Sequence, residues 1–70
     1  MPEIKVTLRG REKPWTRKVK TRSSIVFEAV QEAGVNPLEV LIKVNGEFVP
    51  DIAKIRKGDN VELLEITSRG

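Results

Sequence analysis

The chain has 70 residues and a net charge of +3; 39% of its residues are hydrophobic, 33% are charged, and cysteine and histidine are both absent. This length allows one small domain, and the composition is too apolar for a disordered segment. The missing residue types exclude disulfides, thiolate zinc sites, a cysteine nucleophile and a histidine base. No apolar run is long enough to cross a membrane and the first residues do not form a secretory signal, so we expect a cytoplasmic protein.

The positive charge is concentrated in the first third of the chain. Residues 1–22 contain eight basic and two acidic side chains, which gives this segment a charge of +6 and leaves −3 for the remainder. Such an asymmetry can steer an acidic partner toward one side of a domain. It is also typical of two strands whose lysines and arginines simply face water, and both interpretations remain open.

Two strands joined by a polar turn are expected at the start. Residues 3–9 read EIKVTLR, in which apolar and polar side chains alternate with the period of a half-buried strand. Residues 15–20 read WTRKVK and alternate in the same way, with Trp15, Arg17 and Val19 on one face. The intervening segment 10–14 is polar and contains turn-forming residues, so the two strands should form a hairpin.

An amphipathic helix should follow this hairpin. Val26, Ala29, Val30 and Ala33 recur at the spacing of one helical face. We expect Ser24 to cap the N-terminus of the helix, because serine hydroxyls accept hydrogen bonds from free amides of the first turn. A glycine at 34 and a proline at 37 then end the helix.

The second half contains three more strand candidates. Residues 39–45 form an apolar strand, and the Asn45-Gly46 pair predicts a tight turn into a short return strand at 47–49. Residues 51–57 are ambiguous and allow a helical turn that buries Ile52 or Ile55. Residues 61–66 form the last strand.

The order of these elements predicts an α+β domain over residues 1–70, with 67–70 as a short tail. One helix should pack on one face of a mixed sheet of four to five strands. A right-handed crossover through the helix should place either the last or the third strand parallel to the first.

This order, and two segments in particular, resemble the ubiquitin-like β-grasp fold of the sulfur carriers ThiS and MoaD. The segments are KVNGEFVP at 43–50 and KGDNVELL at 57–64. The resemblance implies that an activating enzyme adenylates the carboxylate of Gly70 with ATP. The adenylate is then converted to a thiocarboxylate, which passes sulfur to an accepting enzyme in cofactor biosynthesis or tRNA thiolation. Such a carrier is not itself an enzyme and needs no metal or cofactor.

In this comparison Thr67, Ser68 and Arg69 form the tail that delivers Gly70 to the activating enzyme. The family ends in two glycines, and Arg69 stands in place of the first. The alternative is therefore a β-grasp module that binds a protein or RNA partner without covalent chemistry.

Two further features bear on partners. The face of the sheet opposite the helix is the natural docking surface, and a partner-binding set is expected there, consisting of Lys5, Lys18, Lys20, Leu41 and Lys43. Trp15 and Phe48 near basic residues would also suit stacking on RNA. We expect instead that Phe48 packs in the core and that Trp15 covers the edge of the hairpin.

Overall fold

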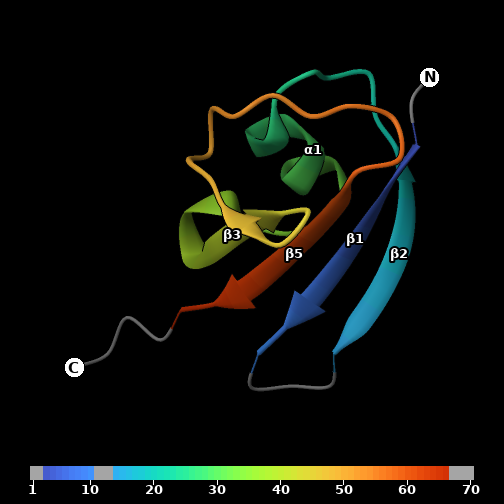
Figure 1. Ribbon diagram of the computed structural model, residues 1–70. Helices are drawn as coiled ribbons and strands as arrows, with labels where there is room; N and C mark the ends of the chain where they lie inside the picture. The colour runs from blue at the N-terminus through green and yellow to red at the C-terminus, as the bar shows by residue number, and fades with distance from the viewer. Residues whose placement is uncertain (1–2, 11–13, 67–70) are drawn as a thin grey trace.

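The computed structural model describes residues 3–10 and 14–66, so the expected tail at 67–70 lies outside the described residues. Within them the chain forms a small α+β domain with a five-stranded mixed sheet and one α-helix on one of its faces (Figure 1). This confirms the predicted α+β class, with a mixed sheet and one helix on one face. The elements in chain order are β1 (Glu3–Arg9), β2 (Trp15–Lys20), α1 (Val26–Glu32), the 3-10 helix η1 (Pro37–Glu39), β3 (Val40–Val44), β4 (Glu47–Phe48) and β5 (Asn60–Glu65).

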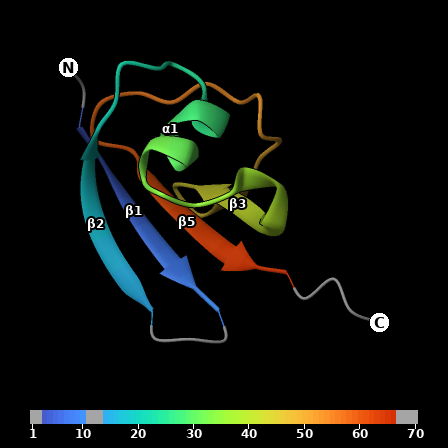
Figure 2. The same ribbon diagram turned by 180° about the vertical axis from the view of Figure 1, so that it is seen from behind.

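The first and last strands lie side by side in the middle of the sheet. The strand order is β2-β1-β5-β3-β4, in which β1 and β5 are parallel and the other neighbours are antiparallel. Of the two arrangements that the sequence left open, the chain therefore places the last strand parallel to the first. Figure 2 shows the same layers from behind, with α1 covering the sheet and β2 at its outer edge.

The core lies between α1 and the sheet, and the alternation of the strands supplies it. Ile4 and Val6 of β1 and Val61 and Leu63 of β5 are at most 1% exposed, while the residues between them in each strand point the other way. The helix contributes the predicted apolar stripe, which is buried from Val26 to Ala33. Trp15 packs against this core at the start of β2.

The prediction that Ser24 caps the helix is wrong. The N-cap is Ile25, which makes no side-chain capping hydrogen bond. The neighbouring Ser23 stabilises the turn before the helix instead, since its hydroxyl accepts a hydrogen bond from the backbone amide of Ile25 at 3.0 Å. The chain therefore turns into the helix one residue later than the capping rule indicates.

The segment 51–57 explains why no side-chain cap is needed. It contains turns rather than the helical turn considered above, and the carbonyl of Ala53 accepts a hydrogen bond from the Val26 amide at 2.9 Å. A distant backbone group thus pairs an amide that a cap would otherwise satisfy. Ile55 is buried in this segment, whereas Ile52 is 73% exposed.

The predicted turn at Asn45-Gly46 is confirmed. Both residues have positive φ, 53° and 88°, as a tight turn between antiparallel strands requires. The side-chain amide of Asn45 also donates through Nδ2 to the Asp59 carboxylate at 3.0 Å, and its Oδ1 accepts from the backbone amide of Asn60 at 3.0 Å. The turn after β3 is thereby joined to the start of β5.

The two faces of the sheet should differ in their contribution to the free energy of unfolding. Leu63 is fully buried under α1, and Leu41 on the other face is 49% exposed. We expect Leu63→Ala to lower the free energy of unfolding by about 2–5 kcal/mol, because it leaves a cavity. Leu41→Ala should cost about 1 kcal/mol or less. Urea denaturation of both variants measures this, and equal losses would contradict the assignment of the faces.

Candidate functional site

The candidate site is the face of the sheet opposite α1, called here the open face. The cross-strand register places alternate residues of every strand on it. These are Glu3, Lys5, Thr7, Arg9, Thr16, Lys18, Lys20, Leu41, Lys43, Phe48, Asn60, Glu62 and Leu64. All five residues predicted to bind a partner belong to this set, so the structure brings them to one face.

Lysines gather at the β1–β2 side of the open face. Lys5 lies directly opposite Lys18, and Lys20 follows on the same face of β2. Within residues 3–10 and 14–66, the ion pairs are Arg9–Glu62 and Lys43–Glu62, so none of these three lysines is paired there. Like charges placed directly opposite each other in a sheet are destabilising. The Lys5–Lys18 pair is therefore unfavourable for folding and favourable for an acidic partner, whereas Lys20 lies opposite Glu3.

Apolar side chains gather at the β3–β5 side. Leu41 lies directly opposite Leu64, and Phe48 lies opposite Lys43 one step further along β3. The expectation that Phe48 packs in the core is wrong: the ring is 62% exposed, and the Lys43 ammonium lies 5.1 Å from its centroid. β4 is only two residues long, and its pairing with Lys43 fixes Phe48 on the open face rather than under α1.

A carboxylate joins the two sides of the open face. One oxygen of Glu62 accepts from Nε of Arg9 at 2.8 Å, and the other lies 3.9 Å from Nζ of Lys43. Neither Arg9 nor Glu62 was in the predicted site. Their proximity depends on the pairing of strands more than 50 residues apart, which no local pattern specifies. With Lys43 they place a charged border beside Leu64 and the other apolar residues.

The chain leaves the sheet next to these apolar residues. The Ile66 amide donates to the Glu39 carbonyl at 3.0 Å, which holds the residue after β5 against the start of β3. On the other side Gly10 lies so close to Glu65 that a Cβ at position 10 would meet the Glu65 Cβ at 2.7 Å. The end of β5 is thus held between β1 and β3. The predicted tail residues Thr67, Ser68, Arg69 and Gly70 lie outside the described residues.

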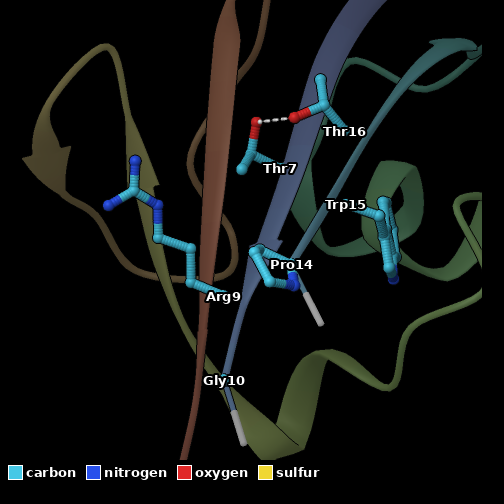
Figure 3. Close-up of a pocket in the computed structure, with 6 residues that line it drawn as sticks. All are labelled: Thr7, Arg9, Gly10, Pro14, Trp15 and Thr16. Atoms are coloured by element: carbon cyan, nitrogen blue, oxygen red, sulfur yellow. Dashed lines mark hydrogen bonds between the residues drawn. The ribbon is translucent and has the colours of Figure 1, made fainter. Parts of the chain in front are cut away.

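A shallow hollow lies at the hairpin end of β1 and β2. Figure 3 shows Arg9 extending across β5 while Trp15 lies on the opposite side of the sheet, toward the helix. Thr7 and Thr16 also line the hollow, and their hydroxyls are hydrogen-bonded at 3.1 Å. Among the described lining residues the charged side chain is Arg9, which is already paired with Glu62, so these residues offer no pair of free titratable groups for acid–base chemistry.

Comparison with known proteins gives no match to a protein-family model and none to a curated protein sequence. Among the residues that the structure describes, no group of acidic side chains is placed to hold a metal ion. In the same residues, no helix has the length and apolar character that a membrane span requires.

The opposed lysines generate a prediction about stability. Lys18→Glu should raise the free energy of unfolding by about 0.2–1 kcal/mol, because it converts the Lys5–Lys18 repulsion into an attraction. Lys18→Gln removes the repulsion alone and should give a smaller gain. Urea denaturation at low and high salt measures both effects, and salt should reduce them. Destabilisation by Lys18→Glu would show that the lysine cluster carries no repulsion.

Proposed function

We propose that the chain is a β-grasp sulfur carrier of the ThiS and MoaD type that acts in the cytoplasm. A partner enzyme would adenylate the Gly70 carboxylate with ATP and release pyrophosphate. A persulfide on a sulfur-donating enzyme would then displace AMP, and a thiol would reduce the resulting acyl disulfide to the thiocarboxylate, which passes its sulfur to an accepting enzyme. The mixed five-stranded sheet with one helix on its face is compatible with the β-grasp fold. The carrier itself supplies a folded body and a carboxyl group, and the two enzymes supply the chemistry.

The observation that carries this proposal is where β5 ends. The backbone of Ile66 is hydrogen-bonded to that of Glu39. Ile66 follows Leu64 by two residues, so the chain leaves the sheet beside the apolar side of the open face. The four residues that follow can extend over at most about 13–14 Å. An enzyme that docks on Leu41 and Leu64 would therefore have the carboxyl group within reach of a nearby active site.

The open face has the composition of a docking surface. Leu41 and Phe48 are exposed apolar side chains, and charged groups of Arg9, Lys43 and Glu62 surround them. Interfaces commonly combine an apolar centre with a polar border. The Lys5–Lys18 pair on the same face favours an enzyme with an acidic surface, which would be attracted before contact.

The second candidate is a module of the same fold that binds its partner without covalent chemistry. The observation that favours it is Arg69, which stands where the carrier family has glycine. Glycine lets a backbone approach closely, whereas arginine adds a long charged side chain. An activating enzyme for this chain would need a wider channel, with an acidic residue to receive the guanidinium.

The covalent proposal is tested at Gly70. We expect full-length protein purified from its native cells to contain a form heavier by the difference between one sulfur and one oxygen atom. A chain lacking Gly70 should show neither this form nor an AMP adduct, because the reacting carboxylate has moved by one residue. Intact-mass spectrometry and fragmentation of the C-terminal peptide measure both. An unmodified wild type in cells that contain an activating enzyme would favour the non-covalent module.

The docking surface is tested with two exposed apolar residues. Leu41→Arg should reduce the modified fraction at least about tenfold, because burying an unpaired guanidinium at an interface is costly. Ile52→Arg is the matched control, since Ile52 is also exposed but belongs to the segment beside α1. Urea denaturation should show that both variants are folded. Equal effects of the two substitutions on the modified fraction would rule out the open face as the docking surface.

A further inference from the structure

The edge of the sheet at β2 offers a second surface, separate from the apolar side of the open face. β2 is the outermost of the five strands and is six residues long, while the strand at the other edge, β4, has two residues. In Figures 1 and 2 no described segment runs alongside the outer side of β2. A strand of this length with a free edge can pair with another extended chain.

The hydrogen bonds of β1 determine which backbone groups of β2 point outward. The Lys5 amide donates to the Asp59 carbonyl at 3.0 Å, and the Glu3 carbonyl accepts from the Gly58 amide at 2.9 Å. Glu3 and Lys5 therefore direct their backbone groups toward β5. Because backbone groups alternate along a strand, Ile4 directs its groups toward β2.

The register transfers this alternation to β2. Ile4, Val6 and Leu8 of β1 face Val19, Arg17 and Trp15, and these are the pairs that exchange backbone hydrogen bonds. The other residues of β2 turn their amides and carbonyls outward. They are Thr16, Lys18 and Lys20, and each offers one donor and one acceptor along the free edge.

The side chains along the edge differ between its two sides. On the open face the edge carries Lys18 and Lys20, which are unpaired within the described residues. On the helix side Trp15 and Val19 are half-buried against the core, and the Arg17 guanidinium stacks 4.0 Å from the centroid of the Trp15 ring. One side of the edge is thus cationic, and the other presents two half-buried apolar side chains with the exposed Arg17 between them.

We propose that the β2 edge binds an extended segment of a partner protein in which acidic and apolar residues alternate. The segment adds to the sheet as a sixth strand and pairs with the outward amides and carbonyls of Thr16, Lys18 and Lys20. Side chains of a strand alternate between faces, so its carboxylates lie beside Lys18 and Lys20 while its apolar residues cover Trp15 and Val19.

Electrostatics and backbone geometry favour this acidic segment over two other possible partners of the β2 edge, a second copy of the chain and RNA. A second copy of the chain paired edge to edge would bring its own row of lysines against this one, which is unfavourable. RNA phosphates would be attracted to the lysines but would not use the alternating backbone groups or the apolar side. The two basic residues with outward backbone groups, Lys18 and Lys20, favour an acidic strand over both.

The test uses a capped octapeptide in which glutamate alternates with valine. On adding it to the full-length protein, we expect amide hydrogen exchange measured by NMR to slow at least about tenfold at Thr16, Lys18 and Lys20. The amides of Arg17 and Val19 already bond to β1 and serve as internal controls. Binding without this alternating protection would overturn the proposal, as would concentration-dependent dimerisation through the same amides in the absence of peptide.

Two methylated peptides separate backbone pairing from charge. Methylation of the glutamate amides should abolish an antiparallel addition, and methylation of the valine amides a parallel one, because each removes the donors that face β2. One of the two peptides should therefore lose affinity at least about tenfold while the other retains it. Equal affinities would overturn the proposal, and so would binding of an oligouridylate that competes with the peptide while leaving the edge amides unprotected.

A pair of substitutions at one position completes the test. Lys18→Pro removes an outward amide without removing a bond to β1, whereas Lys18→Ala keeps the amide and removes the same charge. Lys18→Pro should weaken peptide binding several-fold more than Lys18→Ala, with exchange at Arg17 and Val19 showing that β2 remains formed. Equal losses would mean that only charge matters and would overturn the strand addition.

Discussion

The parallel pairing of β1 with β5 is the contact on which the rest of the structure depends. Val6 lies opposite Val61 and Leu8 opposite Leu63, so the two ends of the described chain form the centre of the sheet and the floor of the core. In a domain of this size little other apolar surface is available to hold the layers together. The same pairing fixes the end of β5 between β1 and β3. The position from which the last residues leave is therefore a consequence of the core itself.

Strand alternation then divides the chain's chemistry between two faces. A shift of one residue would exchange the faces of a strand, so burial of the core residues determines where the charged ones must lie. In β1 the buried Ile4 and Val6 alternate with Lys5 and Thr7. Burial of the two apolar residues therefore places Lys5 on the open face, although its side chain makes no ion pair there with the described residues. Because Lys5 opposes Lys18 directly, electrostatics weakens the sheet at this point. In the proposed docking role, the same pair of lysines would attract an acidic partner.

Much of the fold follows from the sequence because its signals are local. The alternation in residues 3–9 and 15–20, the helical stripe and the Asn45-Gly46 turn each specify their element within a few residues. The start of the helix differed from the prediction because the carbonyl of Ala53, far along the chain, accepts a hydrogen bond from an amide that Ser24 was expected to satisfy. The position of Phe48 differed from the prediction because the orientation of a two-residue strand is determined by the strand with which it pairs and not by the hydrophobicity of its residues. Tertiary contacts determine both the start of the helix and the orientation of Phe48, and local sequence patterns carry no information about such contacts.

The candidate site divides in the same way. The lysines of the open face could be assigned from alternation alone, whereas Arg9, Glu62 and Leu64 become neighbours only through the register of β1 with β5. The edge of β2 is likewise a property of strand order, because the same six residues would be covered if another strand lay outside them. Lys18 belongs to both surfaces, its side chain to the open face and its backbone groups to the edge. The apolar centre at Leu41 lies on β3, with β1 and β5 between it and β2, so an enzyme and an extended segment would meet different parts of one small sheet.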